Sequence, residues 1–436
     1  MKNIAQTIIR TLLLGLLLHF VVLTWLEYRM GLTGSLLTVI ALWKEILVVV
    51  WAARLWAQHH QYIIQLRRSD QVFRIITMIL FVTIAVTIAI GAGWWYAIGS
   101  YIAAFKYNLI GFGVWWLAYI SGTMMTWWDS KRIAQWYVMI IKIMLVLSVV
   151  RYAALVVKPW VLKYLWYSKT TYEWSLDAQP PAVYYSEMTS GIQRNQFVFE
   201  RPITYGFWLT ALWPLFFVVV LRRKSLSDTW FWRLMYTMAV VFTFSRAARW
   251  AWLMQIVILW YWTYQSTFKQ FARKILLPAI IVIVGVWYLG FHEIFWWGRK
   301  FSTTWHINAL ITSAQAVSEH PWIGWWPGSV GPASHHFGLW YNTENQFLQV
   351  WIEYGVFWLI WWLVLFGLAI AWAVWLRARG GKTSKQSDYL IAYGIGMIGL
   401  AASWMVLHSW VDRQIVRPMM LLIGLWWGVY ISNQNK

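Results

Sequence analysis

The stretch that organises this chain runs from Arg299 to Trp358. Residues 299–331 read RKFSTTWHINALITSAQAVSEHPWIGWWPGSVG, and after a polar loop residues 343–358 read TENQFLQVWIEYGVFW. Most of this stretch lacks an apolar run of membrane-spanning length, and it contains the clearest Pro/Gly turn cluster of the chain. The surrounding sequence is hydrophobic helix, which must hold the stretch in place.

The composition of the chain is that of an integral membrane protein. Of its 436 residues, 61% are hydrophobic and only 12% are charged, which is too apolar for a soluble globular domain. The first apolar run, 11–26, follows a short basic start. It has no small-residue cleavage site and precedes many further runs, so it is read as the first membrane helix rather than as a signal peptide.

Twelve apolar segments predict an all-α, polytopic membrane protein with about twelve transmembrane helices. No linker or break in composition divides the chain, so residues 1–436 are expected to form one membrane domain. Two long loops, 158–205 and 294–347, separate groups of spans. The predicted spans are 11–26, 36–57, 73–92, 108–127, 134–156, 203–221, 231–244, 249–263, 275–293, 348–376, 389–408 and 415–431.

The distribution of Lys and Arg orients these spans. Most basic residues fall in alternate loops, on the side of the N-terminus, which the positive-inside rule assigns to the cytoplasm. Both termini are therefore predicted to be cytoplasmic, and both long loops external, in a multi-pass protein of the cell membrane. The net charge of +21 is explained by these loops, so no nucleic acid partner is expected.

The second long loop is expected to contain a helix at the membrane surface, over 298–320. Its apolar residues recur at helical spacing, and Ser302 or Thr303 is a candidate N-cap. A helix of this kind lies against membrane lipid. His320-Pro321 ends it, and Pro327-Gly328 makes a turn. The apolar positions are Ile307, Leu310, Ile311, Ala314 and Val317.

Three arginines fall on the predicted external side, in or next to the long loops. Arg194 lies late in the first loop, Arg246 follows the seventh span, and Arg299 opens the second loop. A guanidinium group binds two phosphate oxygens at once and stays charged, so three that converge would suit a diphosphate. For each arginine taken singly, snorkelling or contact with a lipid headgroup remains the alternative.

Acidic and amide side chains lie where the second loop enters the tenth span. Glu344 is a candidate general base or a ligand for sugar hydroxyls, and Asn345 follows it directly. The alternative for Glu344 is a helix N-cap, since acidic residues favour that end of the helix dipole. Glu353, further along, is equally compatible with a structural carboxylate paired with an arginine.

Metal binding is not predicted. The chain has no Cys, and the spacing of the histidines matches no compact ligand pattern. These histidines are His306, His320, His335 and His336.

A further set of charged residues lies in or near other spans. Lys44 and Glu45 lie inside the second span, and neighbours at i and i+1 do not face one another on a helix. Each is therefore expected to pair with another helix, with a proton relay as the alternative. Asp412, Arg413 and Arg417 lie near the external end of the last span, where they complete the external site or anchor it.

Three motifs, in this order and on one side, resemble the O-antigen ligase and O-antigen polymerase superfamily. They are FTFSRAARWAWL, GRKFSTTW followed by EHPWIGWWPG, and TENQFLQVWIEYGVFWLI. The resemblance covers roughly residues 190–375. It implies a GT-C-like, metal-independent glycosyltransferase that needs no cofactor and takes glycan from undecaprenyl diphosphate. It also implies that Arg246 and Arg299 bind the diphosphate, while Arg194 occupies the usual arginine place before a proline.

The resemblance also bears on the acceptor. Glu344 stands where ligases of the family have a histidine, which favours a polymerase in which this carboxylate orients or deprotonates the acceptor hydroxyl. Asn345, Trp305, His320 and Trp325 are then the expected substrate-binding residues. The family further suggests a flippase and a chain-length regulator as partners. A ligase with another acceptor, and a membrane transporter, are the alternative functions.

Overall fold

The computed structural model describes most of the helical part of the chain. Twelve α-helices, one π-helical segment and one two-stranded hairpin are described. The described residues are 2–32, 34–71, 73–75, 77–78, 81–82, 85, 110–157, 188–189, 192–199, 201–222, 225–263, 300–331, 334, 343, 345–360, 362–364, 367, 385–404 and 413–434. The elements are α1 (Lys2–Met30), α2 (Gly34–Ala41), α3 (Trp43–Ser69), α6 (Ile110–Thr123), α7 (Trp127–Val157), β1 (Met188–Thr189), β2 (Ile192–Gln193), α10 (Pro202–Phe216), η1 (Phe217–Leu221), α11 (Leu226–Phe242), α12 (Arg246–Thr263), α16 (Lys300–Glu319), α17 (Gln346–Tyr354), α19 (Lys385–Trp404) and α20 (Arg413–Gln434).

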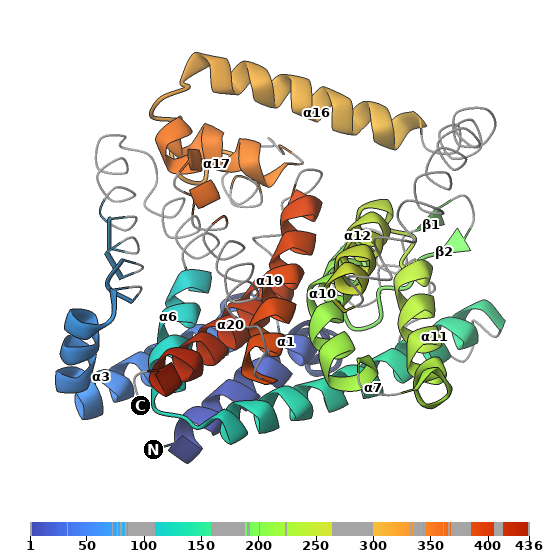
Figure 1. The fold of residues 1–436 in the computed structure, drawn as a ribbon. Helices are drawn as coiled ribbons and strands as arrows, with labels where there is room; N and C mark the ends of the chain where they lie inside the picture. Colours follow the sequence, from blue (N-terminus) through green and yellow to red (C-terminus); the bar gives the residue numbers. More distant parts are fainter. Residues whose placement is uncertain are drawn as a thin grey trace.

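The predicted all-α class is confirmed for these residues, and the helices form a bundle (Figure 1). Only the short pair β1–β2 departs from it, with Met188 opposite Gln193. Four described helices are long and apolar enough to cross a membrane, or five if α2 and α3 count as one bent span.

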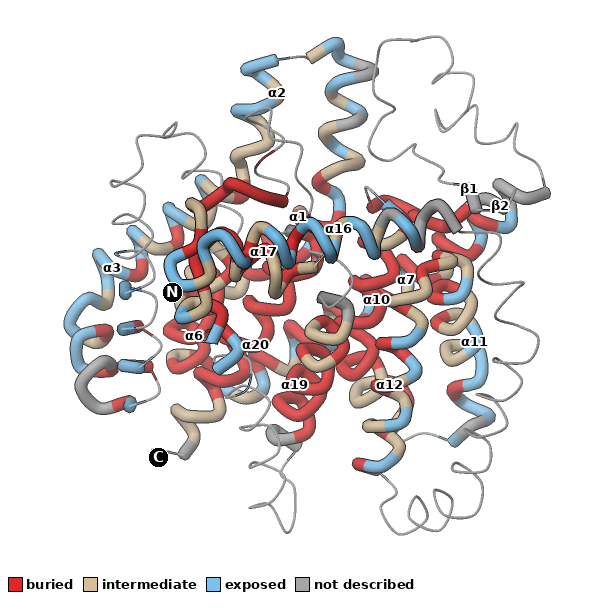
Figure 2. Tube along the Cα trace, turned by 90° about the horizontal axis from the view of Figure 1, so that it is seen from above, coloured by how far each residue is buried: buried red, intermediate tan, exposed pale blue. Residues whose placement is uncertain are grey.

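The outer faces of these helices are apolar as well as the inner ones. On α1, Leu13 and Leu17 are buried, whereas Leu14, Leu18 and Val22 are 39%, 36% and 46% exposed. A surface helix of a soluble protein would carry polar residues on that outer stripe. A helix that is apolar all round belongs in a membrane or in the core of a large protein. Figure 2 shows how exposed and buried positions alternate along the outer helices.

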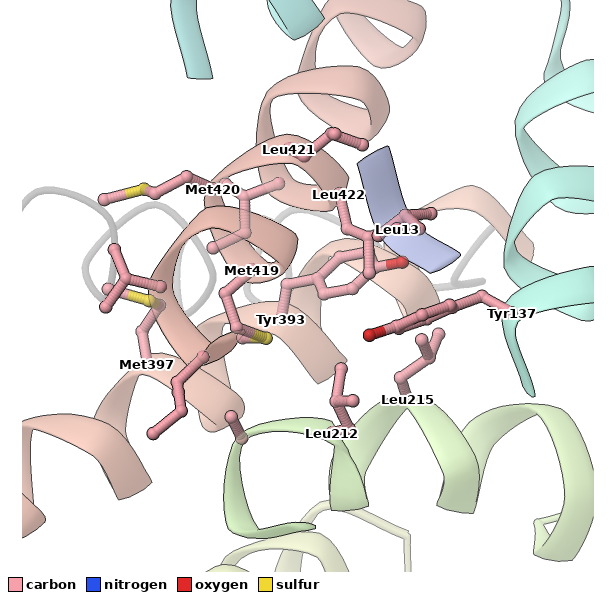
Figure 3. Packing of buried hydrophobic residues seen from close by; sticks show 14 of the residues in the cluster. Leu13, Tyr137, Leu212, Leu215, Tyr393, Met397, Met419, Met420, Leu421 and Leu422 are labelled. Atoms are coloured by element: carbon pink, nitrogen blue, oxygen red, sulfur yellow. The ribbon is translucent and has the colours of Figure 1, made fainter. Parts of the chain in front are cut away.

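The core lies where α1, α7, α10, α19 and α20 meet (Figure 3). Its residues come from segments far apart in the sequence, so it forms only when the whole bundle assembles. Side chains of this cluster that Figure 3 labels are Leu13, Tyr137, Leu212, Leu215, Tyr393, Met397, Met419 and Leu422.

Helices α6 and α20 approach each other more closely than large side chains would allow. A Cβ placed on Gly428 would lie 2.1 Å from the carbonyl oxygen of Tyr119, and one on Gly424 would lie 2.4 Å from that of Trp115. Gly424 and Gly428 are spaced as small residues are in close helix pairs of membrane proteins. This pair of glycines fixes α20 at the centre of the bundle.

Local sequence explains several helix ends. Pro202 opens α10 at a position where its missing N–H costs nothing. The hydroxyl of Ser225 caps α11 by accepting from the backbone N–H of Asp228 at 3.2 Å. Pro214 lies inside α10, and three residues later the helix widens into η1, where the N–H of Arg222 donates to the carbonyl of Phe217 at 2.9 Å.

Two predicted spans are interrupted, so their prediction as continuous helices was wrong. The span 36–57 breaks at Leu42, where α2 and α3 meet at 40°. The span 348–376 breaks at Gly355, which has φ 81° and follows the last residue of α17. A Cβ on Gly355 would lie 2.1 Å from the carbonyl oxygen of Trp322. Only glycine combines this backbone conformation with so close a contact.

The fourth span also ends earlier than predicted. Helix α6 stops at Thr123 rather than near residue 127, and α7 begins at Trp127. The carboxylate of Asp129 accepts from the backbone N–H of Thr126 at 2.9 Å. This contact starts α7 before the apolar run that predicted it. The predicted span 275–293 and most of 73–92 lie outside the described residues.

The helix predicted over 298–320 is observed as α16. It begins at Lys300, so Ser302 and Thr303 lie inside its first turn and the prediction that one of them caps the helix was wrong. In Figure 1, α16 crosses over one side of the bundle, with its N-terminal end above β1 and β2. Its apolar residues Ile307 and Ile311 are 49% and 54% exposed. They face away from the protein, as a helix against lipid would require.

Different charged groups mark the two ends of α10. At the η1 end, Arg222 forms an ion pair with Asp388 at the start of α19, at 2.5 Å. At the Pro202 end lies the segment that contains Arg194. The ends of the chain lie away from α16 in Figure 1. Arg222 and the start of α19 are thus at one end of the bundle, and Arg194 is at the other.

Candidate functional site

A short, strained turn joins α11 to α12. Phe244 has φ 50°, an uncommon value for a residue with a side chain. The hydroxyl of Thr243 accepts from the N–H of Ser245 at 3.2 Å, and the hydroxyl of Ser245 accepts from the N–H of Ala248 at 3.3 Å. These two bonds hold the turn and start α12. Backbone strain of this kind clusters at ligand-binding and catalytic sites.

The segment before α10 is tied to this turn. The Nε of Arg194 donates to the carbonyl oxygen of Thr243 at 2.8 Å, and the N–H of Asn195 donates to that of Phe242 at 2.8 Å. The side chain of Asn195 reaches the carbonyl of Ser148 on α7 at 3.3 Å. The residue Phe197 also has a positive φ, 49°. Hydrogen bonds therefore hold the segment before α10 against the turn between α11 and α12.

Three arginines gather at this junction. Arg194 is buried at 4% exposure, whereas Arg246 and Arg249, in the first turn of α12, are partly exposed. Arg249 lies near enough to Arg246 and Arg194 for their charges to repel it. Its Nε also points to the carbonyl oxygen of Ser245, at 3.4 Å. We call Arg194, Arg246 and Arg249 the arginine cluster.

Arg246 and Arg249 add positive charge at the start of α12. The arginine cluster sits at the N-terminus of α12, which itself carries partial positive charge from the helix dipole. Among the residues that the structure describes, no carboxylate forms an ion pair with Arg246 or Arg249; the ion pairs found there join Lys44 and Arg417 to Glu45, and Arg222 to Asp388. Such a site stabilises an anion, because guanidinium groups and free helix N–H groups both donate to its oxygens.

A second polar region is formed by the turn after α16 and by α17. The Trp325 indole N–H donates to the Ala316 carbonyl at 3.1 Å, and the Trp325 backbone N–H donates to that of Ile352 at 2.7 Å. His320 is exposed, and its ring meets that of Trp325 edge to face at 5.0 Å between centroids. These bonds join α16 and α17 into one unit and leave the ring of His320 at its surface.

The side chains at the start of α17 have structural partners. The side-chain oxygen of Asn345 accepts from the N–H of Leu348 at 3.0 Å, so Asn345 is the N-cap of this helix. Further along, Gln349 donates to the Glu353 carboxylate at 3.2 Å, and Glu353 is 1% exposed. The capping role that the sequence offered as an alternative for Glu344 thus belongs to the next residue.

The structure brings together only part of the predicted site. Arg194 and Arg246 lie at one junction, where Arg194 bonds to Thr243 three residues before Arg246. Arg299 and Glu344 lie outside the described residues, and Trp305 is placed within α16 with nothing described of its side chain. Arg249 was missed by the sequence reasoning, although its spacing of three residues from Arg246 puts both on one face of a helix.

Arg417, in the last predicted span, has a described partner on α3 rather than in the arginine cluster. Arg417 forms an ion pair with Glu45 of α3 at 3.0 Å and is 3% exposed. It therefore ties α20 to α3 inside the bundle. Asp412 lies outside the described residues.

Within the described part of the chain, no group of three His, Cys, Asp or Glu side chains is placed to hold a metal ion. No protein-family model matches the chain, and no curated protein matches it.

Proposed function

We propose that the protein is a glycosyltransferase of the cell membrane that polymerises glycan repeat units carried on undecaprenyl diphosphate. The observation that carries the proposal is the arginine cluster, whose positive charge at the N-terminus of α12 suits a diphosphate. The order of the motifs in the sequence supports the same function. In this proposal the chain has about twelve spans in a GT-C-like arrangement, with cytoplasmic termini and an external active site.

The arrangement of the bundle supports an external site. The arginine cluster lies at the end of α10 opposite to Arg222 and Asp388, and Arg222 begins a basic loop that the sequence assigns to the cytoplasm. Helix α16 has an exposed apolar face and its N-terminal end lies above β1 and β2 (Figure 1).

The proposed reaction is a single displacement at the anomeric carbon of the donor sugar. The acceptor hydroxyl attacks this carbon, and its proton passes to the carboxylate of Glu344. The bond from the anomeric carbon to the diphosphate oxygen breaks, and undecaprenyl diphosphate leaves with the electron pair. Arg246 and Arg299 stabilise the negative charge that develops on the leaving group. The configuration at the anomeric carbon is inverted.

The second polar region provides surfaces for sugar. The exposed ring of His320 and the adjacent indole of Trp325 lie in the unit formed by α16 and α17. Aromatic faces stack on sugars through their apolar C–H surfaces. Arg194, whose Nε bond holds the turn, has a positioning role in the diphosphate site in addition to its charge.

The test is a reconstitution with purified protein in liposomes. Lipid-diphosphate-linked repeat units are added without metal or nucleotide sugar, and the products are separated by length. We expect a ladder of longer lipid-linked glycans that is lost in Arg246→Ala. Arg54→Ala, at an exposed arginine of α3, is the matched control and should keep the ladder.

Other outcomes identify the alternatives. Transfer that appears only after a second acceptor is added would make the protein a ligase. Labelled donor that crosses the liposome wall without elongation would make it a transporter, and the assignment of Arg246 to a leaving group would then be wrong.

A further inference from the structure

A cavity of about 130 Å³ lies between α1, α3 and α6, three helices that contact one another. The start of α1 lies beside α3 and α6 in both Figure 1 and Figure 2. The cavity has no residue in common with the arginine cluster or with the unit of α16 and α17. The proposed glycosyl transfer therefore makes no use of it.

The wall of this cavity is apolar. Ile8, Leu55 and Met125 line it and are buried. The indole nitrogen of Trp51 and the hydroxyl oxygen of Ser121, two residues of the same wall, are themselves buried, so mainly carbon atoms face the cavity. A buried water needs about two to four polar partners, and an apolar cavity of roughly 150 Å³ stays dry and binds benzene. The cavity therefore suits a hydrocarbon of that size rather than water.

The mouth of the cavity is polar and cationic. Arg54 and Gln58 line the cavity and are exposed, so the cavity reaches the protein surface beside them. They are four residues apart on α3, which puts both side chains on one face of the helix. The ion pairs among the described residues join other cations to Glu45 and Asp388, so within that part of the chain Arg54 has no carboxylate partner. An anionic group of an occupant can pair with Arg54.

The three helix ends around the cavity belong to one side of the predicted topology. Ala5 precedes the first predicted span, Arg54 lies near the end of the second, and Met125 lies near the end of the fourth. All three ends fall on the side of the N-terminus, which the positive-inside rule assigns to the cytoplasm. Basic pockets between membrane helices on that side bind the head groups of anionic lipids. The cavity is thus placed where the head groups and chains of one leaflet meet.

We propose that the cavity between α1, α3 and α6 binds an anionic phospholipid, with part of one acyl chain against the apolar wall and the phosphate beside Arg54. A guanidinium group bonds two phosphate oxygens at once and stays charged. The amide of Gln58 supplies further N–H donors. Such a lipid joins an apolar chain to an anion, which matches the apolar wall and the cationic mouth. The inference rests on the membrane location in the proposed function and not on the glycosyl transfer.

The test is photolabelling of the full-length protein in nanodiscs of phosphatidylcholine. The probe is phosphatidylglycerol with a diazirine in one acyl chain, and the labelled residues are identified by peptide mass spectrometry. We expect label on Met125, which lines the cavity and is only 3% exposed, so that a chain reaches it through the cavity. Label that is absent from Met125 would overturn the inference.

Competition by unlabelled lipids tests the charge of the head group. Phosphatidylglycerol should compete about fivefold better than phosphatidylethanolamine with the same chains, because one basic residue near a membrane surface attracts an anionic lipid by about 1 kcal/mol. Equal competition by the two lipids would overturn the assignment of an anionic lipid.

Two pairs of variants locate the chain and the phosphate separately. Ala5→Phe places a ring in the cavity and should abolish label on Met125, whereas Ala53→Phe, at an exposed alanine of α3 outside the cavity, should keep it. Arg54→Gln should keep the label and lose the preference for phosphatidylglycerol, whereas Arg132→Gln, at an exposed arginine of α7, should keep both. Label retained in Ala5→Phe would refute the chain site, and a preference retained in Arg54→Gln would refute the phosphate site.

The labelling and the competition in the wild-type protein stand even if a variant does not fold. Both are measured without a glycan donor, so they are separate from the test of the proposed function. Label on Met125 in a protein that forms no glycan ladder would contradict the glycosyl transfer alone. A ladder without label on Met125 would contradict the lipid site alone.

Discussion

The arginine cluster and the buried cluster of Lys44, Glu45 and Arg417 contain similar cations in opposite electrostatic situations. Arg246 and Arg249 are partly exposed, repel each other and have no described carboxylate as partner. Arg417 is buried and shares the carboxylate of Glu45 with Lys44. Among the described residues no carboxylate pairs with Arg246 or Arg249, whereas Arg417 pairs with Glu45. The carboxylate of Glu45 joins Arg417 of α20 to α3, whereas the role we propose for Arg246 and Arg249 is to bind an anionic ligand.

The largest effect is expected at the arginine cluster. Arg246→Ala and Arg249→Ala should each lower the rate of glycan elongation by about 100- to 1000-fold, since each removes a preformed charge from the leaving group. The measurement is the rate of ladder formation in liposomes. Their thermal unfolding should stay close to that of wild type. Activity above half of the wild-type level in Arg246→Ala would remove this residue from the site.

A smaller effect, on stability rather than activity, is expected at the buried cluster. Glu45→Gln removes the carboxylate that lies 3.0 Å from the buried guanidinium of Arg417 and should lower the free energy of unfolding by about 3 kcal/mol. The double variant Glu45→Gln/Arg417→Met should recover part of this loss, because it removes the buried guanidinium that the single variant deprives of the Glu45 carboxylate. Thermal unfolding in detergent measures both. Additive losses in the double variant would show that the two residues are not coupled.

Arg194 carries a positive charge in the arginine cluster and also holds the turn between α11 and α12 through its bond to Thr243. Arg194→Lys removes the Nε donor from the carbonyl of Thr243 and should cost about 1–2 kcal/mol of stability. Thermal unfolding is the measurement, and Arg201→Lys, at an exposed arginine of the same segment, is the control. Equal stability of Arg194→Lys and wild type would mean that the bond to Thr243 does not hold the turn.

The smallest effect is stabilisation by a ligand. Inorganic diphosphate at about ten times its dissociation constant should stabilise the protein by about 1.4 kcal/mol, since it binds only the folded chain. The response should disappear in Arg246→Ala/Arg249→Ala and persist in Glu45→Gln. If Glu45→Gln instead abolished the stabilisation by diphosphate, the anion would bind near Glu45 and Arg417 and not at the arginine cluster.

Part of the candidate site followed from the sequence. The positions of the apolar runs put Arg194 and Arg246 at the same end of their helices, and the structure joins them through Thr243. Arg249 was not singled out, because an arginine at the edge of an apolar run resembles a snorkelling side chain. The breaks at Leu42 and Gly355 were also missed. Hydropathy measures the average over a window, and neither break lowers that average.

The sequence by itself determined the all-α class and the position of most described helices. Hydropathy and its periodicity are local properties of the chain, and they decide which segments form apolar helices. Only the tertiary structure decided which charges are neutralised. The pair Glu45–Arg417 joins residues 372 positions apart, and the approach of Gly428 to Tyr119 depends on which helices pack together. Periodicity shows which face of a helix is apolar, but it does not say which helix that face will meet.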